Sequence, residues 1–323
     1  RCIMKALLSF SLLTLVLLVA CEKQTTTGPE PYQQNNSASP TTSHPDFPAL
    51  PTELNELPDE FQENLVTLPA GSQNQLANAV ENAGENGTVL LQAGVHSESG
   101  TVLVNHTVRI VGEPGAILVF DTQPTPPLDY MQPGIHVQNA SNVVVWGLEI
   151  RPKSQDGGTA IMLENAPDAT VGNNKIYDYQ FGVSLQHANR AKIMQNTIVG
   201  TLLWQDNSVD VAAGVWVMNG DNVEITQNNI SNYLFGAFAS DREGYLLRNT
   251  LHDNMFGTIL CKIPTNFKMP SGDVVGSELA AHRWQVRRNS AHNSGYAGYL
   301  IIDGANHNYF SQNEASNSGT YDV

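Results

Sequence analysis

The chain has 323 residues, of which 31 are Asp or Glu and 16 are Lys or Arg, so its formal charge is −15. An acidic surface of this size repels nucleic acid, and we expect no nucleic-acid partner. Only three cysteines are present and no Cys/His spacing of the zinc type occurs, which argues against a structural zinc site and a disulfide framework.

The first segment has the pattern of an export signal. Lys5 precedes a run of apolar and small residues from Ala6 to Ala20, which predicts secretion rather than a membrane-spanning helix. Cys21 directly follows Leu18-Val-Ala and resembles a bacterial lipobox, which implies a signal peptide over residues 1–20 and a lipid on Cys21. The alternative is an ordinary signal peptide with an incidental cysteine. The lipobox reading predicts a lipid-anchored protein of the bacterial cell envelope, and Glu22 favours the outer membrane.

Residues 21–51 are rich in Thr, Gln, Asn, Ser and Pro. Such a composition buries too little apolar surface to fold, so this segment is predicted to be a disordered tether. The remaining residues, 52–323, are predicted to form one domain, and we expect a monomer.

The domain is predicted to begin with a short helix over Gly71–Ala83, because Leu76, Val80 and Ala83 fall on one helical face. We expect this helix to cover the open end of the fold and hide unpaired strand edges. The runs after Gly87 and over Val108–Gly112 are interpreted as the first turn of that fold, and the run from Gly115 as the start of the second.

A short sequence repeat then recurs along the chain. Each clear copy begins with a glycine, called the anchor here, and contains an Asn-x-Ile or Asn-x-Leu motif further on. The anchor precedes that motif by 14 residues in the copies that begin at Gly182 and Gly214, and by 13 in the copy that begins at Gly236. Weaker copies flank these three, and anchors recur at intervals of 22 and 21 residues. A fixed period of this size predicts a solenoid. The apolar runs are short, alternating and separated by turn residues, so each copy is predicted to be one all-β coil.

The recurring asparagines are predicted to be scaffold residues. Asn174, Asn196, Asn228 and Asn249 hold the same place in their copies. In stacked parallel strands, equivalent amides can form a ladder, each one bonding to the coils on either side of it. Two insertions, near residues 201–210 and 262–282, leave the coils at turns, where binding faces are often built.

The phrase Gly-Val-Ser-Leu … Ile-x-x-Asn-x-Ile is similar to the repeat of right-handed parallel β-helix proteins. That group includes carbohydrate-binding and sugar-hydrolase repeat domains, pectate-lyase-like enzymes, and the copper-maturation protein of nitrous oxide reductase. The resemblance covers roughly residues 88–323 and implies an all-β, right-handed, single-stranded parallel β-helix (pectin-lyase-like fold) with a short N-terminal capping helix. Gly319–Val323 resembles the start of a further coil, so the natural frame is expected to continue. Cys261 is predicted to pack inside a coil.

Five residues after each anchor, a row of polar residues appears. Its members are Glu164, His187, Asn219, Asp241, Lys262 and Asp303. Stacked strands lie about 4.8 Å apart, so these side chains are predicted to form a line along the outside, with Arg242 beside it. The resemblance to uronan lyases and epimerases implies a cation that neutralises a sugar carboxylate and a base for the C5 proton. Lys262, Arg242, Asp241 and His187 are the candidate catalytic residues. Alternatively, these are merely polar turn positions.

Substrate contacts are predicted for Asn219, Asp303 and Trp204, the last because sugars pack on aromatic rings and Trp204 lies in an insertion. The sequence does not determine whether the side chains of Trp146, Trp216 and Trp284 point into the coil or outward. A second row after the Asn-x-Ile phrase contains His252 and His292, whose stacking would permit a transition-metal site. The alternative is a solvent-facing pair without function. The acidic composition also suits Ca²⁺.

Family signatures for catalysis are missing: neither the Trp-Ile-Asp-His and Arg-x-Pro-x-x-Arg motifs that pectate lyases share nor the Asp-Pro-His-Asp motif of mannuronan epimerases occurs. The chain is therefore interpreted as an envelope protein that binds or modifies polysaccharide, as a lyase or epimerase if it is an enzyme. A non-catalytic structural or adhesion protein and a copper-handling protein are the alternatives.

Overall fold

The computed structural model describes residues 64–121, 132–154, 157–201, 211–240, 242–263, 267–268, 274–275, 280–302 and 304–319. All of them belong to the compact unit Leu57–Val323. The predicted signal peptide, lipid site and tether lie outside the described residues.

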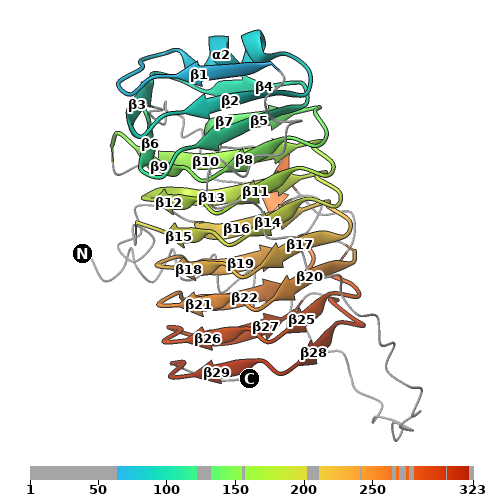
Figure 1. Ribbon diagram of the computed structural model, residues 1–323. Coiled ribbons are helices and arrows are strands. Elements are labelled where there is room, and N and C mark those ends of the chain that lie inside the picture. Colours follow the sequence, from blue (N-terminus) through green and yellow to red (C-terminus); the bar gives the residue numbers. More distant parts are fainter. Residues whose placement is uncertain are drawn as a thin grey trace, which may run out of the picture. The chain divides into compact units, whose positions relative to one another are not determined.

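Three parallel sheets make up this unit (Figure 1). The ten-stranded sheet contains β1 (Leu65–Leu68), β2 (Gly87–Leu91), β5 (Val108–Gly112), β8 (Val144–Trp146), β11 (Thr170–Gly172), β14 (Lys192–Met194), β17 (Val223–Thr226), β20 (Gly244–Leu247), β25 (Gln285–Arg287) and β28 (Tyr309–Ser311). The eight-stranded sheet contains β4 (Val102–Val104), β7 (Pro133–Gln138), β10 (Gly157–Glu164), β13 (Tyr179–Gln186), β16 (Ala213–Met218), β19 (Phe235–Ala239), β22 (Phe256–Leu260) and β27 (Ala297–Ile301). The nine-stranded sheet contains β3 (Gly94–Glu98), β6 (Ala116–Phe120), β9 (Glu149–Pro152), β12 (Lys175–Tyr177), β15 (Thr197–Val199), β18 (Asn229–Ser231), β21 (Thr250–His252), β26 (Ser290–His292) and β29 (Glu314–Ser316).

The chain visits the three sheets in a repeating order, which confirms the predicted solenoid of coils. From β16 in the eight-stranded sheet it passes to β17 in the ten-stranded sheet, then to β18 in the nine-stranded sheet, and returns to pair β19 with β16. Alternating side chains fill the interior: Val215 and Val217 of β16 are fully buried. The corners are made by polar residues in the left-handed region, such as Asn219 at φ 55° and Asn222 at φ 57°. Asn tolerates that conformation better than most residues, which explains its frequency at these turns.

The predicted capping helix is confirmed as α2 (Leu76–Ala83), which buries Leu76, Ala79, Val80 and Ala83 and packs on β1 and β2. Figure 1 shows it above the first coils. The Glu98 side chain of β3 accepts the backbone N–H groups of Gln75 and Leu76 at 3.0 and 2.9 Å. A carboxylate at this end satisfies otherwise unpaired donors and complements the helix dipole.

The prediction for the first coil was wrong. Gly87 pairs with Val108, so β2 and β5 belong to successive coils of the ten-stranded sheet. The two runs lie 21 residues apart, which is one full repeat, and the first coil begins earlier, with β1 before α2. Strand β1 has little sequence signal, because only one of its four residues is fully buried.

The asparagine ladder is confirmed. Asn196 Oδ1 accepts the Asn174 N–H at 2.9 Å, and Asn196 Nδ2 donates to Val171 O at 2.9 Å and to Asn228 Oδ1 at 2.9 Å. The same pattern runs on through Asn249, Asn289 and Asn313. These buried amides bind backbone N–H groups at the corner and carbonyl groups of the preceding strands, so the ladder is structural.

The interior is mainly apolar, and the buried polar groups in it include the hydroxyls of Tyr179 and Tyr233. The Tyr179 and Tyr233 side chains are fully buried, and neither hydroxyl has a hydrogen-bond partner among the described residues. Burial raises the pKa of both phenols. Cys261 is 4% exposed, as predicted for a residue inside a coil.

Within the second insertion, β23 (Phe267–Lys268) and β24 (Val274–Val275) form an antiparallel pair. The helices among the described residues are too short to cross a membrane.

Candidate functional site

Three members of the predicted polar row, His187, Asn219 and Lys262, lie at the corner that follows the eight-stranded sheet. Val183 pairs with Val215, and Val215 with Ala237, so His187 and Asn219 hold equivalent places in successive coils. Lys262 follows Cys261, whose N–H donates to Ala239 O one coil earlier, and it is exposed. Asp241, Asp303 and Trp204 lie outside the described residues, so their placement stays a prediction.

Glu164 does not belong to this row. Glu164 pairs with Gln186 and lies at the end of its strand, while Asn165 holds the place equivalent to His187. The error arose because Thr159 pairs with Phe181 rather than with Gly182, so the anchor of that coil is one residue later. A one-residue shift in a strand moves a side chain to the opposite face or onto the turn.

The candidate catalytic residues are spread along the row. His187 and Lys262 are separated by three coil steps, or about 14 Å at 4.8 Å a step. They therefore cannot act on one reacting atom. Arg242 and Lys262 belong to neighbouring coils, and the Arg242 guanidinium lies 3.7 Å from Asp221 in the preceding coil. Arg242 is thus held by an acidic neighbour at the same corner.

The structure adds a polar cluster that sequence reasoning missed, on the outer face of the eight-stranded sheet. His136 Nε2 lies 2.8 Å from Glu164 Oε2, and Gln138 Nε2 donates to the same oxygen at 2.9 Å. The side chains of His136 and Glu164 are 18% and 36% exposed. If neutral His136 donates from Nε2, its Nδ1 carries a lone pair that can accept a proton. Pro133 pairs with Thr159, so Gly134 holds the anchor position of its coil, two residues before His136.

A column of outward-facing residues, in register across successive strands of the same sheet, contains aromatic residues in its later coils. His136, Met162, Ser184, Trp216 and Phe238 pair in register from β7 to β19. Trp216 stacks on Phe238 at 4.0 Å between ring centroids, and the two are 5% and 7% exposed. Trp216 therefore faces outward from the coil but is covered. Of the other undecided tryptophans, Trp146 is 7% exposed and Trp284 is fully buried.

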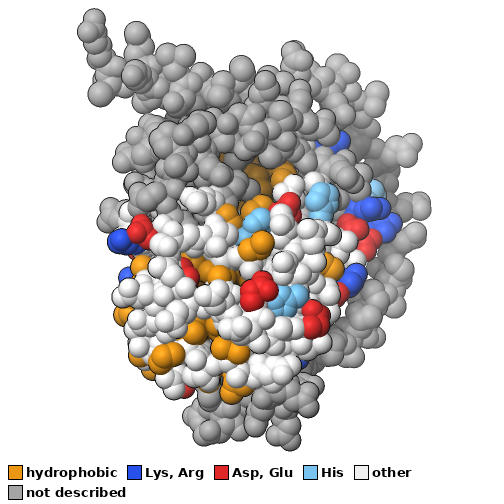
Figure 2. All heavy atoms as spheres, turned by 90° about the horizontal axis from the view of Figure 1, so that it is seen from above, with side chains coloured by type: hydrophobic (Ala, Val, Ile, Leu, Met, Phe, Trp, Pro, Cys, Tyr) orange, Lys and Arg blue, Asp and Glu red, His pale blue; other side chains and the backbone are white. Residues whose placement is uncertain are grey.

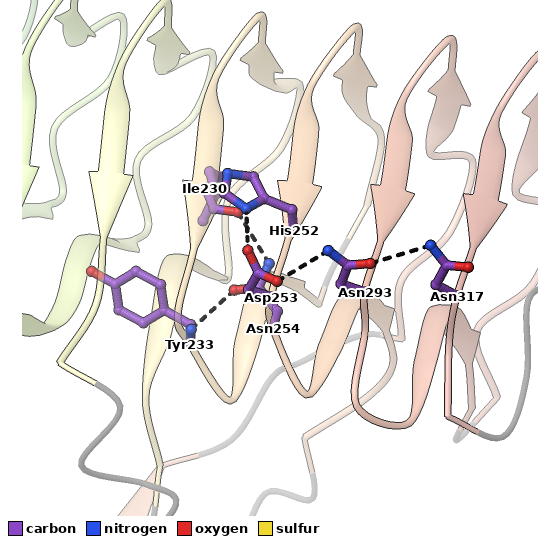
Figure 3. Close-up of polar contacts among 7 residues, drawn as sticks. All are labelled: Ile230, Tyr233, His252, Asp253, Asn254, Asn293 and Asn317. Atoms are coloured by element: carbon purple, nitrogen blue, oxygen red, sulfur yellow. Dashed lines mark hydrogen bonds and ion pairs between the residues drawn. The ribbon is translucent and has the colours of Figure 1, made fainter.

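The second histidine row is confirmed as a stacked pair. His252 pairs with His292 in the nine-stranded sheet, and their rings lie 5.2 Å apart and nearly parallel. Figure 3 shows that His252 Nδ1 contacts Asp253, at 2.6 Å, and that Asp253 also accepts from Asn293. The hydrogen bond from His252 lowers the pKa of Asp253. No group of three or more His, Cys, Asp or Glu in the described ranges could hold a metal ion.

Charge is unevenly placed over the described surface. Figure 2 shows Lys and Arg near the margins of the visible face, several of them beside Asp or Glu, and His and acidic side chains toward its middle. Among the described ion pairs, Arg190 and Asp168 make two contacts, of 2.8 and 2.6 Å, which lower the pKa of Asp168.

Comparison with known proteins agrees with this architecture. The family model of the right-handed β-helix region matches residues 128–267. The Dettilon tailspike protein superposes with a TM-score of 0.50 at 12% identity, over 73% of this chain and 52% of the tailspike. The chain is a right-handed parallel β-helix. This β-helix spans about half the length of the tailspike, and at such identity the likeness shows the fold alone.

Two further structures are similar at lower scores. An alginate lyase from Paenibacillus sp. str. FPU-7 has a TM-score of 0.49 at 11% identity, covering 80% of this chain and 99% of the lyase. A periplasmic alginate epimerase has a TM-score of 0.45 at 11% identity, covering 80% and 60%. A search of curated proteins finds no match to the β-helix.

Proposed function

We propose that this β-helix binds or modifies a polysaccharide along the corner that follows its eight-stranded sheet. The observation that carries the proposal is the row of His187, Asn219 and Lys262, in which hydrogen-bonding side chains recur coil after coil. A polymer presents similar groups at regular intervals and can contact several coils at once. A small ligand could use only one or two of them.

The separation of the row's members assigns them to different sugar units. Lys262 and Arg242, on neighbouring coils, are positioned to meet one sugar carboxylate, and His187 meets another part of the chain about 14 Å away. In a lyase or epimerase the carboxylate must be neutralised before a base removes the adjacent proton. Asp241 is proposed beside Lys262, while Asn219, Asp303 and Trp204 are proposed to contact substrate. The His136–Glu164 pair, whose members lie three and two coils before Asn219, is a further group that can accept a proton.

The proposal is tested with a panel of acidic and neutral polysaccharides and the full chain in detergent, with and without Ca²⁺. Binding and the ultraviolet absorbance of unsaturated uronate are measured together. Binding with new absorbance means a lyase, and binding alone means an epimerase or a binding module. Lys262→Ala should weaken binding about tenfold, since it removes a charged contact. Lys175→Ala, an exposed lysine on β12 of another sheet, is the matched control.

Absence of binding to every glycan would refute the polysaccharide proposal and favour a structural or adhesion protein, for which a partner would be sought by cross-linking. The copper-handling alternative predicts metal binding that a His252→Ala/His292→Ala double variant abolishes. The stacked geometry of that pair supports proximity, but it supplies only two imidazoles.

We also propose that the mature protein is anchored to a membrane of the bacterial envelope, with the outer membrane favoured, through a lipid on Cys21. The support is the sequence Leu18-Val-Ala-Cys21 after a short apolar run. Labelling of cells with a radioactive fatty acid should mark the wild-type protein and not Cys21→Ser. Equal labelling of the two would refute the anchor.

A further inference from the structure

Three arginines gather where the ten-stranded sheet turns toward the nine-stranded sheet. Leu247 pairs with Arg287, and Arg287 with Ser311, so the three following residues, Arg248, Arg288 and Gln312, occupy one turn position in successive coils. The backbone confirms this alignment, because the Arg248 N–H donates to Arg287 O at 3.0 Å. Arg248 and Arg288 therefore lie one coil apart, at about 4.8 Å between backbones. Both side chains are exposed.

These arginines differ from four others in their contacts with the described acidic residues. Arg151, Arg190, Arg242 and Arg283 each contact a carboxylate at 2.6 to 3.7 Å. By contrast, within the part of the chain that the structure describes, Arg248, Arg287 and Arg288 form no ion pair with Asp or Glu.

Their hydrogen bonds are to neutral groups. Arg287 Nε donates to Ser311 Oγ at 3.1 Å, and Arg288 Nε donates to Gln312 Oε1 at 2.7 Å. These bonds orient two guanidinium groups by their Nε atoms and leave the terminal nitrogens for another acceptor. In a chain with a formal charge of −15, carboxylates are plentiful, so a basic cluster without one is unexpected.

An aromatic column lies beside the arginines on the same face. Tyr245, Gln285 and Tyr309 pair in register, two residues before Leu247, Arg287 and Ser311, so the two columns face outward together. The Tyr309 side chain is 54% exposed, and the Arg287 guanidinium lies 5.9 Å from the centroid of its ring. Sugar rings pack on exposed aromatic faces while their charged groups meet cations, and this patch offers both.

We propose that Arg248, Arg287 and Arg288, with Tyr309, form a second binding site that holds an anionic group of an acidic saccharide. The carboxylate or sulfate of one sugar unit meets the guanidinium groups, and the sugar ring lies against Tyr309. The site is on a different sheet from the Lys262 corner. It rests on the proposed function only in taking the ligand to be a polysaccharide.

The chemistry favours a saccharide over an anionic membrane. A membrane surface would bring the whole molecule, at −15, against a plane of like charge, whereas an oligosaccharide meets only the local basic cluster. Inorganic sulfate or phosphate could bind the guanidinium groups, but these ions have no ring that would pack on Tyr309. The three ligands can therefore be told apart by which residues they need.

The test measures binding to the full chain at low ionic strength by isothermal titration calorimetry. The probes are a hexamer of galacturonate, its methyl-esterified form, a sulfated oligosaccharide, inorganic sulfate, and vesicles of phosphatidylglycerol. Arg248→Ala/Arg288→Ala should weaken binding of a charged hexamer at least tenfold and leave the melting temperature unchanged, because both side chains are exposed. Arg151→Ala is the control, since Arg151 is exposed but faces Glu149. Tyr309→Ala should weaken saccharide binding only.

Loss of binding on esterification, together with these variant effects, supports the site. Equal affinity of wild type and the double arginine variant would overturn it, and so would equal affinity for the hexamer and inorganic sulfate. Vesicle binding that needs the same arginines would assign the cluster to a membrane and overturn the saccharide site. Binding that depends on Lys262 but not on these arginines would leave the proposed function intact and refute this inference alone. If no saccharide binds at all, both fail.

Discussion

Removal of one rung of the asparagine ladder should destabilise the β-helix far more than removal of its exposed neighbour. Asn228 is 1% exposed, and its Oδ1 accepts the Asn196 N–H at 3.0 Å. Its Nδ2 donates to Ile193 O at 2.8 Å and to Asn249 Oδ1 at 3.0 Å. Asn228→Ala deletes these bonds at a position that is buried from bulk water.

The magnitude follows from the groups left without partners. The Asn196 N–H lies at the corner and the Ile193 carbonyl lies in the middle of β14, and each loses its side-chain partner. At about 1–3 kcal/mol for each buried polar group left unpaired, the free energy of unfolding should fall by about 2–6 kcal/mol. Coils contact mainly their neighbours, so the loss should concentrate in the coils that contain Asn196, Asn228 and Asn249.

Urea unfolding followed by circular dichroism measures the free energy, and amide hydrogen exchange of Asn196 reports the broken bond. Asn229→Ala is the control, because Asn229 directly follows Asn228, is exposed and begins β18. Its cost should be within about 0.5 kcal/mol of zero. If the two variants lose equal stability, or if the Asn196 amide in Asn228→Ala exchanges as slowly as in wild type, the ladder is not what holds this corner together.

Three other perturbations test the packing and the charges. Gly182→Ala should cost about 1–3 kcal/mol, because its Cβ would come within 2.5 Å of the Gly214 carbonyl oxygen; a thermal melt equal to that of wild type would contradict this. Tyr233→Phe should be neutral or raise stability by up to about 1 kcal/mol, since it removes a buried hydroxyl without a partner. The raised pKa of Tyr233 also predicts that wild type loses stability above the unfolded phenol pKa of about 10, and that Tyr233→Phe loses less; equal pH profiles of urea midpoints would disprove this. Asp168→Asn should cost under about 1 kcal/mol, because the carboxylate is 37% exposed. The fold lowers the pKa of Asp168, so the stabilisation by this carboxylate is present at neutral pH and disappears as pH falls through the folded pKa. As salt is added, the free energies of unfolding of wild type and Asp168→Asn should converge.

The repeated phrase was sufficient to predict the coils, because backbone pairing in a solenoid requires the same turn residues at the same place in each repeat. Asn174, Asn196, Asn228 and Asn249 could be recognised as a ladder from their spacing alone. Asn289 and Asn313 continue it, although an insertion separates Asn289 from Asn249 by 40 residues. The row of His187, Asn219 and Lys262 could be predicted for the same reason, since each residue follows its anchor by five positions.

The sequence did not predict the register between coils, that is, which residues of neighbouring coils pair with one another. Thr159 pairs with Phe181, a shift of one residue that takes Glu164 out of the polar row and places it against His136. The arginine cluster likewise forms only when Arg248 and Arg288, which are 40 residues apart, become neighbours across one coil step. The sequence by itself determined the coil, its corners and its asparagine ladder, because these depend on local turn chemistry repeated along the chain. The tertiary structure decided which side chains from different coils meet, because that depends on insertion lengths and one-residue shifts that periodicity does not encode.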